Sequence, residues 1–591
     1  MTAIVDFIRM PGRSGFSGWR MGVLGLFMFG VGALMIARLV SLQVLEPERF
    51  VEHGENQRIR TAALSAERGS IVDRNGIELA VSTPRESIWA DPRLVTQPIR
   101  TARQIVAIAG GDEDQLTRRL QNEDAKFAWL ARQLDDEQAE AILSLDLPGV
   151  YSTEEQSRIT PAGSEVARGI LGRTDVDGIG LSGLEAQYNE SLTGEEGRIV
   201  VERGIASAGS QAVTIPDGEY ELVSPTAGDS LVLTIDRSVQ FEVENLLAET
   251  VAESGAVSGT AIVSRTATGE ILAMSTVARN SDDQVVVSGE NRAVTWIVEP
   301  GSISKPLAIA ALIEEDLIDS DTSVEVVGSL RIFDQTFTDT VFTGLDELNT
   351  ADILRHSSNI GTALLVDRIG DETFHEYLSD FGLGSPTELD FPGESAGILH
   401  PEEEWSGVSR PAAAIGYGYA ATPLQMLRSY NVFANDGVLV EPHLVAGFQD
   451  ADGDLDIVSP REGRRVISEE TAREVTSLLT GVVTEGGTGQ LASVPGYQIA
   501  GKTGTAQIAQ PGGGYTDEFG EVDLLTSFAG FFPASNPEYS IIALIEEPQG
   551  EVSGGQIAAP LFADITSFVL QHFRVPPAET AFNIDLASNG E

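Results

Sequence analysis

A serine and a lysine stand three residues apart in the segment 299–306, whose sequence is EPGSISKP, just ahead of the apolar run 307–313. Pro300 and Gly301 end whatever precedes them, so we expect Ser302 to be the N-cap of the helix that follows. Ser302 and Lys305 would then face the same way on the first helical turn. A neutral amine can take the proton of a hydroxyl, and the pair therefore predicts a nucleophile, Ser302, with Lys305 as its base.

This chemistry requires Lys305 to lose its proton near the working pH. Burial beside a second cation, at the positive end of a helix, lowers the pKa of a lysine from about 10.4. The chain has 38 lysines and arginines, of which only Lys126, Lys305 and Lys502 are lysines. Arginine thus occupies nearly every position where the side chain only needs to carry a solvated positive charge. The plain alternative is that Ser302 only caps a helix and Lys305 lies on the surface.

Two later segments carry further candidates. Ser357, Ser358 and Asn359 follow the predicted helix 348–355 and should form a short loop between helices. There Ser357 could pass a proton between Lys305 and a leaving amine, Asn359 could hold a substrate amide, and Ser358 should point away.

The other segment is the predicted strand 498–507, in which Gly501 and Gly504 would let a ligand backbone come close. Lys502 would offer its charge to a substrate carboxylate, and Thr503 and Thr505 would add hydroxyl donors. The backbone N–H groups of Ser302 and Thr505 would form an oxyanion hole.

The three segments, in this order and at this broad spacing, resemble the motifs of penicilloyl-serine transferases. The chain is similar to a class B penicillin-binding protein, a membrane-anchored peptidoglycan DD-transpeptidase, from the apolar N-terminal segment nearly to the C-terminus. Segments 68–76, 158–163 and 178–185 resemble signatures of the non-catalytic pedestal of that family. The pedestal signatures look most like the septal, or cell-division, branch.

The resemblance implies an α/β fold in two domains. These are a mixed α/β pedestal of the dimerisation type and a penicillin-binding, serine β-lactamase-like transpeptidase domain, with an antiparallel sheet flanked by helices. It also implies that Ser302 attacks the bond between two terminal D-alanines and that an amine of a neighbouring stem peptide resolves the acyl-enzyme. β-Lactam antibiotics would be trapped on Ser302.

Partners follow from the same resemblance: a D-Ala-D-Ala donor, a diamino acid acceptor, a polytopic membrane glycosyltransferase and division-complex proteins. No cofactor or metal is expected, since the acidic segment 450–456 has its glycine at the wrong place for an EF-hand loop and reads as a solvated turn. Four alternatives stay open: an elongation-type transpeptidase, a DD-carboxypeptidase or β-lactamase that uses water, a penicillin-sensing receptor, and an inactive scaffold.

The elements that must position these residues can be placed from their patterns. We expect strands at 230–235, 259–264, 271–275, 526–532 and 539–545, a helix at 237–252 capped by Asp236, and a last helix at 559–573. This order favours an α/β domain whose sheet is assembled from both ends of the segment. Residues 416–425 should start a helix that belongs to the core and not to the site.

The N-terminal segment predicts a membrane anchor. Arg9, Arg13 and Arg20 precede the apolar run 21–37, and apolar residues continue to 45. We expect one spanning helix, with the N-terminus in the cytoplasm and the catalytic domain outside. A cleaved signal peptide is the alternative.

The predicted division of the chain is a cytoplasmic tail (1–20), a transmembrane helix (21–45), a pedestal (46–226), a transpeptidase domain (227–575) and a C-terminal tail (576–591). The formal net charge of -51 argues against nucleic-acid binding, and the absence of cysteine excludes disulfides and thiol chemistry.

Overall fold

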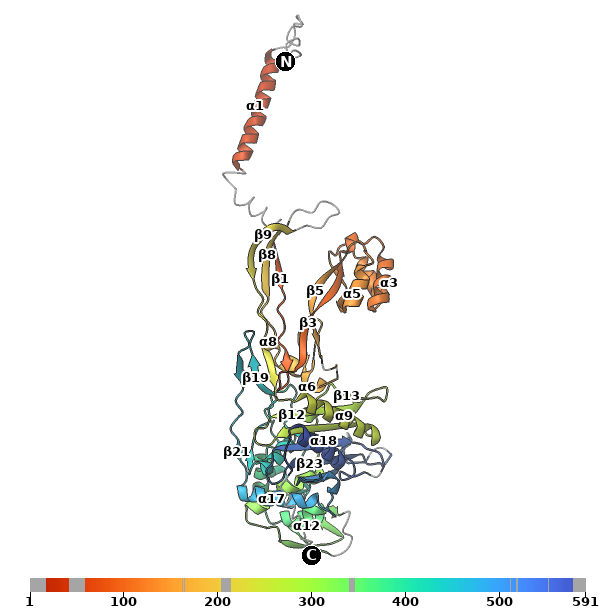
Figure 1. Cartoon of the computed structure of the whole chain (residues 1–591), viewed down its shortest axis with the longest axis vertical. Helices are drawn as coiled ribbons and strands as arrows, with labels where there is room; N and C mark the ends of the chain where they lie inside the picture. The colour runs from red at the N-terminus through yellow and green to blue at the C-terminus, as the bar shows by residue number, and fades with distance from the viewer. Residues whose placement is uncertain are drawn as a thin grey trace, which may run out of the picture. The chain divides into compact units, whose positions relative to one another are not determined.

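The computed structural model describes residues 18–41, 59–161, 163, 165–203, 214–339, 346–510, 512–516, 519–550 and 552–577 (Figure 1). The chain forms two compact units, Met1–Ser65 with Glu196–Pro225 and Ala66–Glu195 with Thr226–Glu591. Most of the predicted cytoplasmic tail, residues 42–45 of the predicted span and the end of the C-terminal tail lie outside the described residues.

The first unit contains one long apolar helix, α1 (Gly18–Val40), and a small sheet. The stretch Trp19–Val40 is long and apolar enough to cross a bilayer, with a mean hydropathy of 2.2. It fits a single-pass membrane anchor. The helix begins at Gly18, three residues before the predicted start, and includes Arg20 in its first turn. The sheet has the order β1-β8-β9, with strands β1 (Ile59–Leu64), β8 (Gly197–Arg203) and β9 (Thr214–Val223).

The pedestal part of the second unit is built on one long strand, β3 (Glu78–Ala90), which pairs with both β4 (Ala128–Leu134) and β5 (Val150–Ile159). Three helices pack against these strands: α3 (Pro98–Ala109), α4 (Glu113–Leu120) and α5 (Asp136–Leu143). Figure 1 shows α3 and α5 beside these strands. Buried apolar residues, among them Ile88, Ile105 and Ile142, form their shared core.

A shared sheet joins the pedestal to the catalytic segment within this unit. Strand β2 (Ile71–Val72) pairs antiparallel with β3 and parallel with β10 (Ser230–Leu233). Strands β19 (Val445–Gln449) and β20 (Leu455–Ile457) extend the same sheet. The expected hairpin at 68–76 is confirmed, and residues 450–454 form the expected turn between β19 and β20.

The catalytic sheet has six strands in the order β13-β12-β11-β24-β23-β22. Its members are β11 (Ser258–Arg265), β12 (Ile271–Arg279), β13 (Val285–Val287), β22 (Ala500–Gln507), β23 (Leu524–Phe532) and β24 (Tyr539–Glu546). Early strands β11 to β13 lie beside late strands β22 to β24. The predicted assembly of the sheet from both ends of the segment is therefore confirmed.

Successive side chains of the catalytic sheet point to opposite faces and pack into two separate hydrophobic cores. On β11, Ala261 and Val263 pack with residues of α9 (Arg237–Glu253) and α18 (Ala558–His572), whereas Ile262 belongs to the other core. The expected cap is present, since the Asp236 carboxylate accepts from the backbone N–H groups of Ser238 and Val239.

The remaining helices and hairpins surround the site. The helices are α10 (Arg292–Thr295), α11 (Lys305–Glu314), α12 (Thr350–Arg355), α13 (Asn359–Val366), α14 (Asp371–Asp380), α15 (Ser409–Ala414), α16 (Pro423–Ala434) and α17 (Glu469–Val482). Strands β15 (Ser329–Ile332) and β16 (Gln335–Thr338) form a hairpin. Two further two-stranded sheets pair β14 (Ser323–Val326) with β17 (Asp346–Asn349) and β18 (Val438–Leu439) with β21 (Arg464–Arg465). The predicted helix 348–355 was wrong at its start, because Leu348 lies in β17 and Asn349 caps α12 by accepting from Asp352 N.

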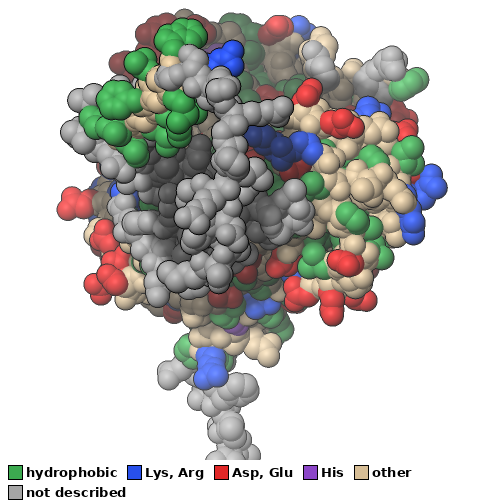
Figure 2. All heavy atoms as spheres, turned by 90° about the horizontal axis from the view of Figure 1, so that it is seen from above, with side chains coloured by type: hydrophobic (Ala, Val, Ile, Leu, Met, Phe, Trp, Pro, Cys, Tyr) green, Lys and Arg blue, Asp and Glu red, His purple; other side chains and the backbone are tan. Residues whose placement is uncertain are grey.

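The smaller elements of the pedestal connect it to the catalytic segment. They are β6 (Arg173–Thr174), β7 (Gly180–Ser182), α6 (Arg168–Leu171), α7 (Gly183–Gln187) and α8 (Asn189–Leu192). The surface is acidic in many separate places: Figure 2 shows Asp and Glu side chains scattered over the visible face. On that face the negative charge is therefore not gathered into one binding site.

Candidate active site

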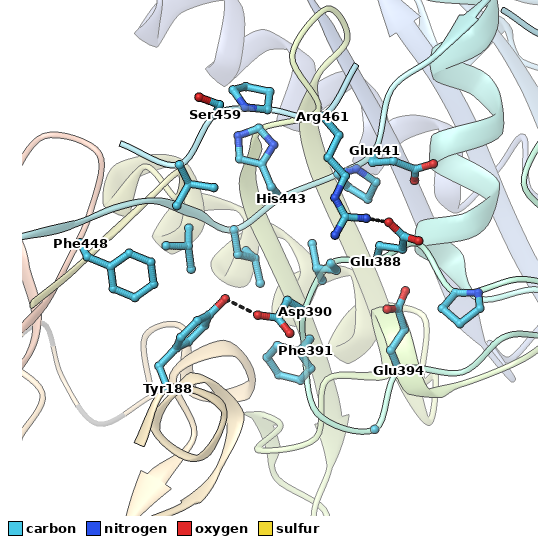
Figure 3. A pocket seen from close by; sticks show the side chains of 18 residues that line it. Tyr188, Glu388, Asp390, Phe391, Glu394, Glu441, His443, Phe448, Ser459 and Arg461 are labelled. Carbon is cyan, nitrogen blue, oxygen red and sulfur yellow. Dashed lines mark hydrogen bonds and ion pairs between the residues drawn. The ribbon is translucent and has the colours of Figure 1, made fainter. Parts of the chain in front are cut away.

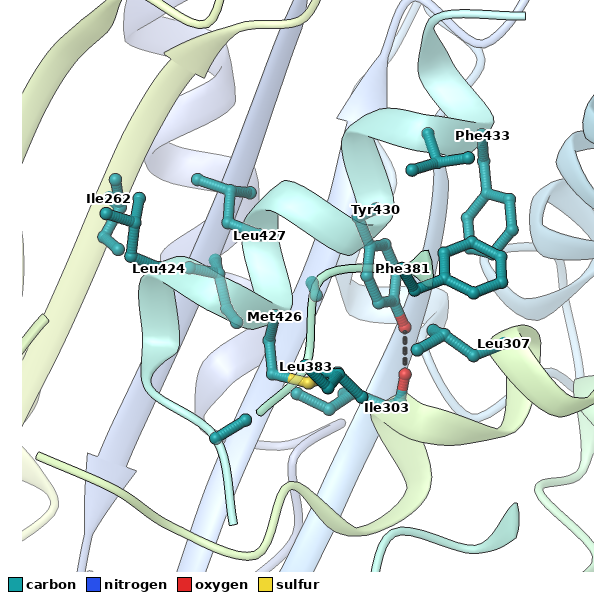
Figure 4. Close-up of a cluster of buried hydrophobic side chains, with 14 of the residues drawn as sticks. Ile262, Ile303, Leu307, Phe381, Leu383, Leu424, Met426, Leu427, Tyr430 and Phe433 are labelled. Atoms are coloured by element: carbon teal, nitrogen blue, oxygen red, sulfur yellow. Dashed lines mark hydrogen bonds between the residues drawn. The ribbon is translucent and has the colours of Figure 1, made fainter. Parts of the chain in front are cut away.

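The turn that carries Ser302 is fixed to the core from below. Tyr430 of α16 is fully buried and donates a hydrogen bond of 2.8 Å to the backbone oxygen of Ile303 (Figure 4). Ile303 and Leu307 pack in the same cluster of apolar side chains. Helix α16 is itself held by a capping box between Thr422 and Gln425. The nucleophile turn thus rests on a rigid, buried helix.

Ser302 is not an N-cap, so that prediction was wrong. Residues Gly301–Ser304 form a 3₁₀ helix, η4, that continues directly into α11. Gly301 has a φ of 60°, which lets the chain turn sharply before the helix. The backbone N–H of Lys305 donates to the backbone oxygen of Ser302. Since residues i and i+3 eclipse in a 3₁₀ helix, Ser302 and Lys305 share one face even so.

Lys305 is fully buried, and its amine bonds to Ser357. Lys305 Nζ donates to Ser357 O at 2.6 Å and lies 3.1 Å from Ser357 Oγ. Burial lowers the pKa of Lys305 to about 7, while the charge of Asp339 acts in the opposite direction. The amine is therefore poised to gain or lose a proton near neutral pH.

His356 to Ser358 form the loop between α12 and α13, and Asn359, expected in this loop, is the first residue of α13. Ser357 has a φ of 60°, in the left-handed region. Ser358 is buried as the N-cap of α13, where its hydroxyl accepts from Gly361 N and donates to Asp339. The side chain of Asn359 donates to Thr338 O at 3.0 Å. The prediction that Ser358 points away from the site is confirmed.

Asp339 is the residue that sequence reasoning missed. Its carboxylate accepts from Ser358 Oγ at 2.6 Å, from Asn359 N at 2.6 Å and from Ile360 N at 3.2 Å. A negative charge is favourable at this place, at the N-terminus of α13. Asp339 follows β16, nineteen positions before Ser358. No motif around it marks the contact.

Strand β22 brings its four motif residues to the edge of the sheet. Lys502 is fully buried, and its Nζ lies 3.0 Å from Thr503 O. Thr503 is buried as well and donates to Thr488 Oγ1. Thr505 is exposed, and its hydroxyl accepts from Gly554 N at 3.1 Å. A ligand arriving at this strand would therefore meet Thr505 first.

The surroundings of Lys502 disfavour its charged form. Burial, and next the charge of Lys305, lower the pKa of Lys502 well below its usual value. The pairing of Lys502 with a substrate carboxylate stays a prediction.

The glycines of β22 make room for protein atoms. A Cβ on Gly504 would lie 2.2 Å from Ser527 Oγ and 3.3 Å from Pro300 O, and one on Gly501 would lie 2.6 Å from the Phe528 ring. The space expected for a ligand backbone is thus filled by the neighbouring strand and the nucleophile turn.

The segment 416–425, which we expected to belong to the core alone, borders the turn that carries Ser302. Gly301 N donates to Gly416 O at 3.0 Å, and a Cβ on Gly416 would come within 2.0 Å of Gly301 O. The turn at 416–418 therefore belongs to the site as well as to the core. The three predicted segments, Asp339 and this turn converge around one buried amine.

A cavity of about 590 Å³ lies elsewhere in the second unit (Figure 3). It is lined by Tyr188 of the pedestal and by segments 386–394, 441–448 and 458–461, and none of the predicted catalytic residues faces it. Tyr188 donates to Asp390 at 2.8 Å across it, and Arg461 pairs with Glu388. It marks a joint between pedestal and catalytic segments.

Comparisons with known proteins agree with this arrangement. Residues 259–567 match the family described as the penicillin binding protein transpeptidase domain, and residues 63–233 the penicillin-binding protein dimerisation domain. The chain is 35% identical to penicillin-binding protein PbpB of Mycolicibacterium smegmatis, over 93% of this chain and 90% of the relative. It is 31% identical to the peptidoglycan D,D-transpeptidase FtsI of Escherichia coli, over 96% and 94%. The structure resembles penicillin binding protein 3 from Mycobacterium tuberculosis complexed with ampicillin, with a TM-score of 0.67, 30% identity, and coverage of 88% of this chain and 98% of that one.

Proposed function

The chain belongs to the penicillin-binding proteins that join a dimerisation domain to a transpeptidase domain, and from this membership we propose a serine D,D-transpeptidase of peptidoglycan. It crosslinks stem peptides through an acyl-enzyme and is acylated by β-lactams. Relatives named FtsI and PbpB support a role in septal wall synthesis.

The first half of the reaction uses Ser302, Lys305 and Ser357. Neutral Lys305 takes the proton of Ser302 Oγ, and the oxygen attacks the carbonyl carbon between the two terminal D-alanines. The C–N bond breaks, D-alanine leaves, and the proton passes from Lys305 through Ser357 to the leaving nitrogen. In the second half an amine attacks the ester, a new C–N bond forms, and Ser302 Oγ regains its proton.

One observation carries this proposal. Lys305 is fully buried, shares a 3₁₀ turn with a serine, and has a pKa near 7 where a surface lysine would stay charged. An amine with a pKa near the working pH is an effective general base. A lysine held there for structure alone would gain nothing from burial.

Substrate binding is assigned to the neighbouring motifs. Thr503, Gly504 and Thr505 line the donor along β22, and Lys502 offers its charge to the donor carboxylate. Asn359 orients the donor amide. The backbone N–H groups of Ser302 and Thr505 stabilise the oxyanion, an interaction typically worth about 3 kcal/mol of the barrier.

Partners and placement complete the proposal. The second substrate is an amine of a diamino acid in a neighbouring stem peptide. A polytopic membrane glycosyltransferase and division-complex proteins work alongside, since we find no sequence signature of a fused glycosyltransferase. The chain is anchored once in the cytoplasmic membrane, with the N-terminus inside and the catalytic domain outside, as the N-terminal arginines favour.

A labelled penicillin tests the nucleophile. We expect mass spectrometry of the full-length protein to find the adduct on Ser302 and not on Ser304, because the Ser304 hydroxyl is buried and bonded to Tyr419. Ser302→Ala should abolish labelling. Label on Ser304, or full labelling of Ser302→Ala, would overturn the assignment.

A reporter tests the topology. An enzyme that is active only in the cytoplasm, fused after Glu591, should be inactive in cells, and one active only outside should work. The opposite result would reverse the proposed orientation.

A further inference from the structure

Glu299, three residues before Ser302, holds a carboxylate whose contacts are all with neutral groups. Tyr515 donates its hydroxyl to Glu299 Oε2 at 2.7 Å, and Gly418 donates its backbone N–H to Glu299 Oε1 at 2.7 Å. Among the described residues, no Lys, Arg or His forms an ion pair with this side chain. Glu299 is partly exposed, so a ligand can reach a carboxylate that no cation of the described residues neutralises.

The backbone holds Glu299 rigidly beside the nucleophile. Val298 and Ala421 exchange two backbone hydrogen bonds, of 3.0 and 2.9 Å, and Gly301 N donates to Gly416 O. Backbone hydrogen bonds therefore fix the segment 298–301 on both sides of Glu299. Three residues span at most about 11 Å, and the left-handed Gly301 shortens this distance. The carboxylate therefore lies within reach of a group bound at Ser302.

The hydrogen bond from Tyr515 to Glu299 is the contact that a bound cation could replace. The Tyr515 ring meets Tyr417 edge to face, with centroids 5.7 Å apart, and the Tyr417 hydroxyl accepts from Gln507 N at the end of β22. Tyr515 itself comes from the segment after β22 and is half-buried. A hydrogen bond from a cation is about twice as strong as one from a neutral hydroxyl, so an ammonium ion can displace Tyr515.

We propose that Glu299 is the binding site for the ammonium group of the acceptor, with the Tyr515 hydroxyl as its stand-in when no acceptor is bound. This inference rests on the proposed function, in which an amine is the second substrate. The ammonium binds Glu299, releases one proton to solvent, and its nitrogen attacks the acyl carbon on Ser302. The C–N bond forms as the C–Oγ bond breaks, and the second amine proton reaches Ser302 Oγ through Lys305.

The rival interpretation makes Glu299 only a clamp between two loops. The two can be separated with glutamine, which carries no charge. Its oxygen can accept from Gly418 N, and its amide N–H can donate to the Tyr515 hydroxyl oxygen, so both contacts of the clamp can persist. Tyr515→Phe does the reverse, since it removes one clamp bond and leaves the charge. A charge site predicts a large effect of E299Q and little effect of Y515F, and a clamp predicts comparable effects of both.

The experiment measures how the acyl-enzyme of the full-length protein divides between amine and water. The donor is a D-alanyl thioester, and the acceptors are Nα-acetyl-lysine amide, which is cationic, and hydroxylamine, which is neutral at pH 7. We expect E299Q to lower the aminolysis-to-hydrolysis ratio for acetyl-lysine amide by tenfold or more and to leave the ratio for hydroxylamine unaltered. Y515F should match or exceed the ratio of the unsubstituted protein, and salt should lower the ratio only where Glu299 is present.

Glu290→Gln is the matched control, since Glu290 is an exposed carboxylate upstream in the same segment, and it should leave both ratios unaltered. An unaltered lysine-amide ratio in E299Q, or an equal loss in Y515F, would overturn the inference while penicillin still labels Ser302. Failure of the unsubstituted protein to acylate at Ser302 would instead overturn the proposed function and this inference with it.

Discussion

Lys305 and Lys502 are both fully buried, and the charge of Lys305 lowers the pKa of Lys502. Two ammonium groups in such a place repel each other, so a proton on one amine disfavours a proton on the other. In the proposed mechanism the donor carboxylate pairs with Lys502, and the charge of Lys502 then favours the neutral form of Lys305, which a base requires.

The first prediction concerns the pH dependence of acylation. Because burial lowers the pKa of Lys305 to about 7, Lys305 is protonated and inactive below that pH and neutral above it. The second-order rate of penicillin acylation should rise with pH and reach half its plateau near 7. Lys305→Arg should lose acylation by several orders of magnitude while the fold persists, because arginine keeps its proton. A near-normal rate in Lys305→Arg would remove lysine as the base.

The second prediction isolates Lys502. Methionine has a similar volume and no charge, so Lys502→Met removes the repulsion between the two amines and lets the pKa of Lys305 rise. We expect the midpoint of the acylation profile to move to higher pH, together with a lower plateau from the lost carboxylate contact. Lys502→Arg keeps a charge and should move the midpoint down, if at all. A profile in Lys502→Met with an unmoved midpoint would contradict the coupling.

At the scale of elements, the hairpin of β15 and β16 positions the catalytic loop. Asp339, just past β16, binds the N-terminal backbone of α13 and the cap residue Ser358. Thr338 O receives the Asn359 side chain. The hairpin thus fixes the loop whose Ser357 touches Lys305. The negative charge of Asp339 also raises the pKa of Lys305, although burial has the larger effect and lowers it.

The third prediction follows from this pair of roles. Asp339→Asn removes the charge, so the pKa of Lys305 should fall and the acylation midpoint should move to lower pH, opposite to Lys502→Met. Loss of a charged helix cap should also lower the free energy of unfolding by about 1 kcal/mol. Acylation profiles and denaturant titrations measure the two effects. Asp334→Asn, in the exposed turn of the same hairpin, is the control; an equal shift there would show that the effect is not local.

Sequence reasoning found the elements whose signals are local. Alternation and turn residues located strands β11, β12, β23 and β24, and Asp236 marked the start of α9. Sequence reasoning failed where contacts with distant residues determine the local structure. Gly301 and the packing of Tyr430 under Ile303 convert the expected N-cap into a 3₁₀ turn, and Asn349 rather than Leu348 sets the start of α12.

The site shows the same division. The spacing of Ser302 and Lys305 is a local signal, and the structure keeps both on one face. Asp339 could not be found, since its partners lie about twenty residues away at the start of α13. A glycine in a strand can indicate the close approach of either a ligand or another part of the protein. At Gly504 of β22 the position of Ser527 shows that protein atoms fill the space.

At the scale of the molecule, the pedestal and the catalytic segment of the second unit are one hydrogen-bonded structure. Ile71 and Val72 of β2 pair with Leu231 and Val232 of β10, so the sheet crosses the boundary predicted near residue 226. The three segments that resemble pedestal signatures also meet in one place. Glu185 accepts from Arg68 Nε and from Arg158 Nε, each at 2.7 Å.

The last prediction tests this buried network. The side chains of Arg68 and Glu185 are 8% and 3% exposed, and Arg68 also bonds to Asn189 and Thr193. Glu185→Gln leaves two buried guanidinium groups without a carboxylate, and breaking a buried pair in this way typically destabilises by about 3–5 kcal/mol. We expect the first transition in a denaturant titration of the full-length protein to shift to lower concentration.

Glu155→Gln is the control inside the same unit. Glu155 pairs with Arg132, but both side chains are 19% exposed and Arg132 keeps Asp177 as a second partner, so the loss should be smaller. Penicillin acylation of the protein that remains folded should persist in both variants, because neither network contacts the residues around Lys305. If Glu185→Gln unfolded no more readily than Glu155→Gln, the three signatures would need an explanation other than stability, and contact with a partner protein would be the one to test.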